Sequence, residues 1–143
     1  MSNLTKHFET VEKGIEMLKI NPLDARGAKE GQWDFDRGSA KVAVGVISTD
    51  RFPNGYFYCS SIIMDASKVA EERKPELYQT LLEINATLVN MRFAFNKNVI
   101  FLISNRDANG LDPEEVAITV NELSYYADLL DDRLQNEFLQ EAS

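Results

Sequence analysis

The strongest constraint in this sequence is the apolar periodicity of its last third. Apolar residues recur there at alternating spacings of four and three, at Val116, Val120, Leu123, Ala127, Leu130 and Leu134. This spacing puts them along one side of an α-helix, because the helix repeats every 3.6 residues. The stretch opens with Asp112-Pro113-Glu114-Glu115, which supplies an N-cap, a first-turn proline and early acids. We therefore predict a long helix that ends near Phe138 and needs another layer to cover its apolar side.

Two further stretches have the same periodicity. In the first, the apolar stripe is Leu4, Phe8, Val11, Ile15 and Leu18. Pro22 is expected to stop this helix, because proline lacks an N–H and clashes with the preceding turn. A loop is predicted over residues 21–27. The second helix is predicted from Glu76 to about Leu88, with its stripe at Leu77, Leu81, Ile84 and Leu88.

Five segments alternate polar with apolar residues, or are rich in β-branched and aromatic residues, as strands are. They are residues 32–36, 41–48, 56–64, 91–96 and 99–104. The element order is thus α-β-β-β-α-β-β-α. It predicts an α+β fold with an antiparallel sheet: a three-strand meander, joined by the final hairpin after the second helix crosses over. We expect a single domain over residues 1–143.

Negative charge is concentrated at one end of the chain. The formal net charge is −8, and residues 107–143 hold ten acidic residues against Arg133 alone, a local net charge of −9. Nucleic acid is not an expected ligand, because phosphate binding needs a basic surface. No apolar run is long enough for a bilayer span, and a single cysteine excludes an internal disulfide framework. We expect a cytoplasmic protein. The acidic helix is either a solvated face or a contact for a basic partner.

Chemistry-bearing residues are few and scattered. His7 is the only histidine and Cys59 the only cysteine, so a zinc site lacks ligands and a thiol nucleophile lacks a nearby base. Residues 107–112 briefly resemble a calcium loop, but the glycine and glutamate that such a loop needs are replaced by Asp112 and Ile118. We therefore predict no enzymatic activity, no cofactor and no metal.

Both faces of the central strands are apolar, which is unusual for a sheet covered on one side only. In residues 56–64, Tyr56, Tyr58, Ile62 and Met64 are expected on one face, opposite Phe57, Cys59 and Ile63. Either the three helices divide themselves between the faces, or one apolar face is left open for a partner. Tyr125 lies off the stripe of the last helix and is a further candidate for protein contact, since tyrosine is favoured at interfaces.

Several segments are familiar in combination: Leu81-Leu82-Glu83-Ile84-Asn85, Phe93-Ala94-Phe95, Val99-Ile100-Phe101-Leu102 and Asp112-Pro113-Glu114-Glu115. With the upstream α-β-β-β order, the chain resembles the type III secretion chaperone-like fold, and within it the YbjN-like family. That resemblance implies a helix-sheet-helix sandwich, usually homodimeric and without enzymatic activity. Secretion chaperones of this kind bind an extended segment of an effector, and YbjN-like proteins are associated with regulation or stress.

The leading hypothesis is a homodimeric, chaperone-like protein that binds a client or regulatory protein. The predicted dimer contacts are Leu77, Leu81, Ile84 and Leu88. The predicted client contacts are Phe8, Val11, Ile15, Tyr56, Tyr58, Ile62 and Tyr125. The alternative is a regulatory or sensory domain that binds a small ligand between helix and sheet, in a pocket lined by Trp33, Phe35, Phe93 and Phe95.

Overall fold

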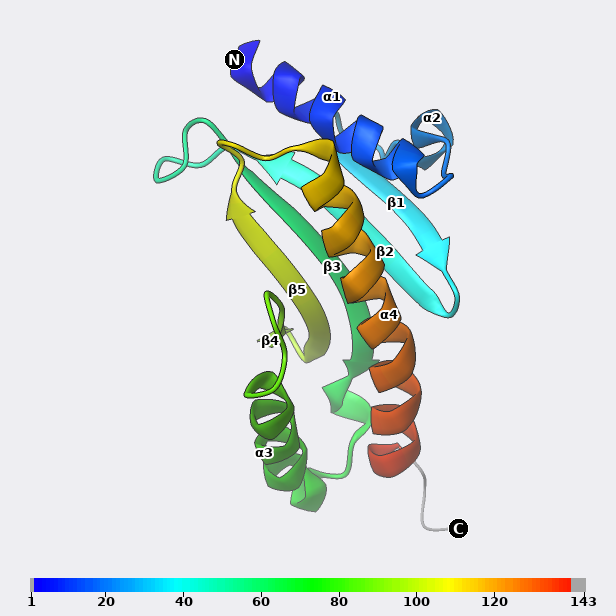
Figure 1. The fold of residues 1–143 in the computed structure, drawn as a ribbon. Helices are drawn as coiled ribbons and strands as arrows, with labels where there is room; N and C mark the ends of the chain where they lie inside the picture. Colours follow the sequence, from blue (N-terminus) through cyan, green and yellow to red (C-terminus); the bar gives the residue numbers. More distant parts are fainter. Residues whose placement is uncertain (1, 140–143) are drawn as a thin grey trace.

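The computed structural model describes residues 2–139, and it contains the predicted elements in the predicted order (Figure 1). The helices are α1 (Ser2–Met17), α2 (Pro22–Ala25), α3 (Lys74–Asn85) and α4 (Pro113–Phe138), with 3-10 turns η1 (Ala66–Lys68) and η2 (Glu71–Arg73) leading into α3. The strands are β1 (Gln32–Arg37), β2 (Ala40–Ile47), β3 (Tyr56–Asp65), β4 (Arg92–Asn96) and β5 (Val99–Asp107).

The five strands form one antiparallel sheet in the order β1-β2-β3-β5-β4. The meander of the first three strands is confirmed, and so is the addition of the final hairpin after α3. The chain enters the hairpin at the outer strand, so β5 pairs with β3 and β4 becomes an edge. The other edge is β1.

Helix α4 lies across the middle of the sheet, over β3, β2 and β5, and α1 packs against α4 (Figure 1). The predicted stripe of α4 is confirmed, because all six of its residues are buried. They meet buried side chains of the sheet such as Val44, Phe57, Ile100 and Leu102. Helix α3 stands apart, beside β4 at one edge of the sheet.

Three predicted boundaries were wrong for local reasons. Pro22 does not end the first helix but begins α2, with the Asn21 side chain as its N-cap; α1 has already ended at Met17, and Lys19 adopts a positive φ of 64°. Helix α3 ends at Asn85 rather than near Leu88. Strand β5 runs on to Asp107, because β3 pairs with it over that whole length.

A polar contact fixes α1 to the start of the sheet. The Glu12 carboxylate accepts two hydrogen bonds from the Arg26 guanidinium, at 2.8 and 3.0 Å, and a third from the Trp33 indole N–H at 2.8 Å. Three separate elements are thereby joined through one side chain. The hydrogen bonds to Arg26, and secondarily to Trp33, lower the pKa of Glu12 from its ordinary value of 4.5.

The lowered pKa predicts how acid weakens the fold. A carboxyl group whose pKa is lower in the folded than in the unfolded chain stabilises the fold at pH above its unfolded value, and this contribution is lost as the pH falls through the folded value. Below about pH 4.5, thermal unfolding should therefore move to lower temperature more steeply in the parent protein than in Glu12→Gln. At pH 7 the variant should be about 1 kcal/mol less stable. Circular dichroism melts measure both, and equal pH slopes would contradict the expectation.

Candidate protein-binding surfaces

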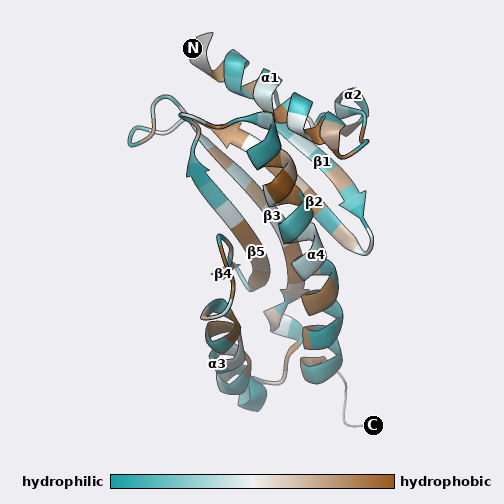
Figure 2. Ribbon diagram, in the orientation of Figure 1, coloured by the Kyte–Doolittle hydropathy of each residue, from teal (hydrophilic) through white to brown (hydrophobic). Residues whose placement is uncertain are grey.

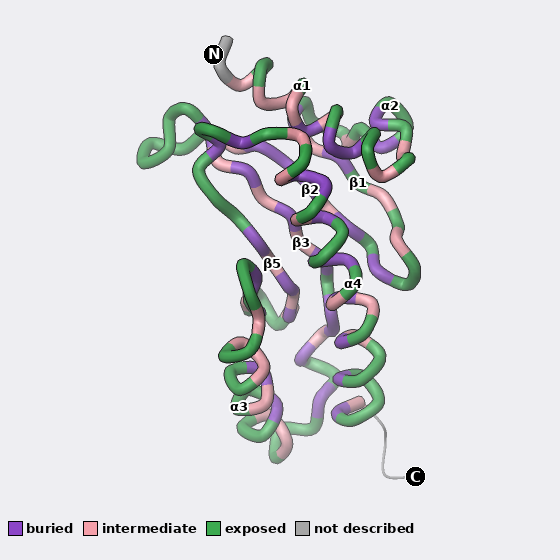
Figure 3. The backbone as a smooth tube through the Cα atoms, in the orientation of Figure 1, coloured by how far each residue is buried: buried purple, intermediate pink, exposed green. Residues whose placement is uncertain are grey.

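One face of the sheet has no helix over it within residues 2–139. Within the described strands, every residue on this face is exposed or half-buried except Gly45, which has no side chain to bury. Figure 3 shows buried segments alternating with less buried ones along the strands. Ile62 and Phe101 lie opposite each other on neighbouring strands, and Ile103 is paired with Ser60 beside them. The Ile62 side chain is 67% exposed. The expected open apolar face is therefore present, and we call these residues with Tyr58 the open sheet face.

The predicted composition of this face was wrong at Met64. The pairing of β3 with β5 shifts by one residue between Ile62 and Met64, so that Met64 pairs with Ile100. A β-bulge of this kind inserts an extra residue and reverses the side-chain alternation beyond it. Met64 is consequently buried on the helix-covered side, as Ile63 also is.

Two of the three tyrosines predicted as client contacts, Tyr56 and Tyr58, are half-buried on this same face. Tyr58 lies against Gly45 of β2, where a Cβ atom would come within 2.5 Å of its ring. Because Gly45 has no side chain, the Tyr58 ring can lie against the backbone of the neighbouring strand. Tyr56 forms an edge-to-face ring contact with Phe52, centroid to centroid 6.0 Å. Both tyrosines lie on the same face as Ile62, four and six residues before it on β3.

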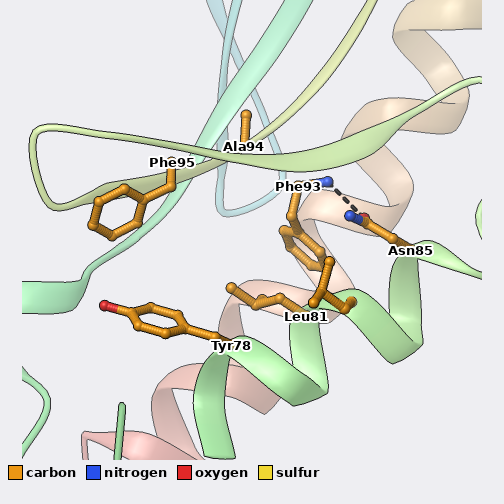
Figure 4. A pocket seen from close by; sticks show the side chains of 7 residues that line it. Tyr78, Leu81, Asn85, Phe93, Ala94 and Phe95 are labelled. Atoms are coloured by element: carbon orange, nitrogen blue, oxygen red, sulfur yellow. Dashed lines mark hydrogen bonds between the residues drawn. The ribbon is translucent and has the colours of Figure 1, made fainter. Parts of the chain in front are cut away.

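A second apolar surface is formed by α3 and the edge strand β4. It is a hollow of about 390 Å³, lined by Tyr78, Leu81, Leu82, Asn85, Phe93, Ala94 and Phe95 (Figure 4). The rings of Tyr78 and Phe95 meet edge to face at 5.9 Å. Asn85 ends α3 and accepts a hydrogen bond from the Phe93 backbone N–H at 2.7 Å, which holds the strand against the helix. We call this the α3–β4 surface.

The residues predicted as dimer contacts are mostly turned inward. Leu77 and Leu81 are buried in the core, whereas Ile84 and Leu88 are half-buried. The exposed apolar residues of α3 are Tyr78 and Leu82, which sequence reasoning missed; Val89 is also exposed but lies beyond the helix, which ends at Asn85. Tyr78 and Leu82 each follow a buried residue of the predicted stripe by one position, and their own spacing of four was the available signal.

The α1 residues predicted as client contacts pack in or against the hydrophobic core. Val11 and Ile15 are fully buried in the core. Phe8 is half-buried and packs edge to face on Trp33, with centroids 6.0 Å apart. Val11 and Ile15 offer no free apolar surface, because α4 and the sheet cover this side of the helix, whereas part of the Phe8 ring lines a hollow with Trp33. Tyr125, in contrast, is exposed on α4.

In residues 2–139, the single cysteine and the potential metal ligands do not come together in a site. Cys59 is buried, and burial raises the pKa of its thiol far above the ordinary value. Within residues 2–139, no three histidine, cysteine or acidic side chains gather as metal ligands. No helix in that range is both long and apolar enough to cross a bilayer. The aromatic residues proposed to line one small-molecule pocket fall into three separate hollows: Trp33 in one, Phe35 in another, Phe93 and Phe95 in a third.

The arrangement of the sheet and helices is the type III secretion chaperone-like fold, as comparison with solved structures shows. A chain of the ExsC–ExsE complex matches with a TM-score of 0.64 at 13% identity, covering 98% of each chain. The ExoU–SpcU heterodimer from the type III secretion system of Pseudomonas aeruginosa matches at 0.60 and 9% identity, over 87% of this chain and 98% of the other. The ExoT–SpcS complex of the same organism matches at 0.55 and 13% identity, over 87% and 97%.

The likeness is one of fold. The sequence matches no protein-family model and no curated protein. Sequence identities of this size say nothing about individual contacts, so the two surfaces have to be argued from their own residues.

Proposed function

We propose that this chain is a non-enzymatic, chaperone-like protein of the cytoplasm that binds a segment of a client protein on its open sheet face. The observation that carries the proposal is the exposure of Ile62 among apolar neighbours on a face that no helix covers. Contiguous apolar surface on a folded protein is costly in water and marks sites where another protein binds. The solved neighbours support the proposal, since each comes from a complex between two different proteins.

A client that fits this face presents apolar side chains to Ile62, Phe101 and Ile103. The flanking strand β1 contributes two exposed carboxylates to the same side of the sheet, Asp34 and Asp36, of which Asp36 is already paired with Lys41 at 3.5 Å. Basic residues beside the apolar segment of the client would complement them. We propose further that the chain is a single domain over residues 1–143 and that two copies pair through the α3–β4 surface, where the apolar hollow is open to solvent.

The client proposal is tested by affinity purification from the native host. We expect a client to co-purify in stoichiometric amount with the parent protein and to be lost with Ile62→Asp, because an unpaired carboxylate would then be buried at the contact. Leu23→Asp, at a similarly exposed leucine on α2, is the matched control and should retain the client.

Retention of the same client by Ile62→Asp would show that binding lies elsewhere. The YbjN-like family also stays a prediction, and the identity of the captured protein separates a secretion chaperone from a YbjN-like regulator.

A further inference from the structure

A second apolar row runs along the outward side of α4, opposite the row that packs on the sheet. Ile118, Tyr125 and Leu129 are 62%, 60% and 53% exposed. Spacings of seven and four residues align them along the helix, over about 17 Å at 1.5 Å per residue. Figure 2 shows the alternation of hydrophobic and hydrophilic segments along α4. Single exposed apolar residues are ordinary, but three in one row at this spacing form the kind of seam with which helices pair.

The same side of α4 is acidic. Glu114, Glu122 and Asp132 are exposed there, less than a quarter-turn from the row by the helical repeat. Among the described residues, none of these three carboxylates has a salt-bridge partner; the salt bridge that α4 does form joins Glu115 to Arg106 at 2.6 Å, on its flank. The one basic residue of α4, Arg133, is also exposed on this side. The row is therefore bordered by three carboxylates and one guanidinium, which leaves the border predominantly negative.

We propose that the outward side of α4 binds an amphipathic helix of a different protein, one that carries apolar residues at four-three spacing bordered by lysine or arginine. Charge complementarity selects this occupant, because the three carboxylates would face basic side chains. A second copy is disfavoured, since two identical acidic faces would repel each other. The surface lies on the opposite side of the sheet from the open sheet face, so it stands whether or not the proposed function holds, and both surfaces are free to be occupied together.

The test uses the full chain and two synthetic 21-residue helical peptides. Both have leucines at four-three spacing; one borders them with lysine and the other with glutamate. We expect one lysine peptide to bind per chain, with amide shifts in the nuclear magnetic resonance spectrum confined to α4, and no binding of the glutamate peptide. Tyr125→Ser with Leu129→Ser should weaken binding at least tenfold. Glu122→Lys with Asp132→Lys should reverse the preference between peptides. Ile62→Ser, on the open sheet face, should change neither.

Other outcomes overturn the proposal. Binding of the lysine peptide that survives the Tyr125 and Leu129 changes, or that is lost equally with Ile62→Ser, would place the contact elsewhere or reduce it to general charge attraction. Absence of binding at millimolar peptide would exclude this class of partner. If the Tyr125 and Leu129 changes instead turn a dimer into a monomer by light scattering, the row is a contact between copies of the chain.

Discussion

Replacing Gly14 by valine is expected to lower the free energy of unfolding by about 3 kcal/mol. Gly14 lies inside α1, and a Cβ atom there would come within 2.5 Å of the Val116 Cβ and 2.8 Å of the Pro113 carbonyl oxygen on α4. The two helices cross so closely only because this residue has no side chain. In an open helix the same replacement would be neutral or slightly stabilising, because glycine is a poor helix former. Packing against α4 therefore makes the replacement destabilising.

The measurement is urea denaturation, with thermal unfolding as a second readout. The midpoint of thermal unfolding should fall by about 10 °C for a chain of this size. Glu16→Val, on the exposed side of the same helix, is the matched control and should change stability by no more than about 0.5 kcal/mol. The free energy of unfolding of Gly14→Ala should lie between those of the parent and Gly14→Val. A Gly14→Val variant as stable as the parent would mean that α1 does not pack on α4 as described.

The parts of the fold that the sequence predicted well are those where periodicity and local chemistry agree. Helix α4 has a capping box, in which Asp112 and Glu115 each satisfy the other's backbone N–H, together with a proline in the first turn and an unbroken apolar stripe. The sequence accordingly predicted its start at Pro113 and its end near Phe138, and the helix spans Pro113–Phe138. The β4–β5 hairpin was also predicted from the sequence. In the structure, Lys97 and Asn98 both adopt the positive φ that its two-residue turn requires.

The surfaces were harder to predict, because periodicity shows that a residue is covered without showing what covers it. Val11 and Ile15 have the spacing of a binding face, yet α4 and the sheet bury them. Leu77 and Leu81 likewise fill the core, which leaves the adjacent position Leu82 outside. Neighbouring positions on a helix differ by about 100° in direction, so periodicity alone does not decide which of two adjacent rows of α3 faces the core.

Two local details were beyond the sequence for a different reason. The bulge near Met64 depends on how β3 and β5 pair along their whole length, which is not encoded in either strand alone. Asn85 was part of the family resemblance without an assigned role. In the structure its side chain accepts a hydrogen bond from the Phe93 N–H, eight residues further along the chain on the edge strand β4, and this contact occupies a backbone donor of an edge otherwise open to further pairing.

Leu82→Asp is expected to convert the proposed dimer of this chain into monomers, with a rise in the dimer dissociation constant of at least about 100-fold. Leu82 is 69% exposed on the α3–β4 surface, so an aspartate there costs the single chain little. In a symmetric pair each copy contributes the same surface to the contact, so one substitution places two unpaired carboxylates in a dry apolar interface. Neither charge has a basic partner among the residues that line the hollow.

Light scattering across a dilution series measures this change, and circular dichroism checks that the variant is folded. Leu23→Asp is again the matched control, because Leu23 is 61% exposed on a different element; it should remain a dimer. Phe95→Ser should weaken the dimer to a lesser degree, because it removes the ring that packs on Tyr78 without adding charge. A parent protein that is monomeric at every concentration would refute the pairing through α3 and β4, whereas loss of the client with Ile62→Asp would still support the open sheet face. The dimer test probes the α3–β4 surface and the client test probes the open sheet face, so either proposal can fail while the other holds.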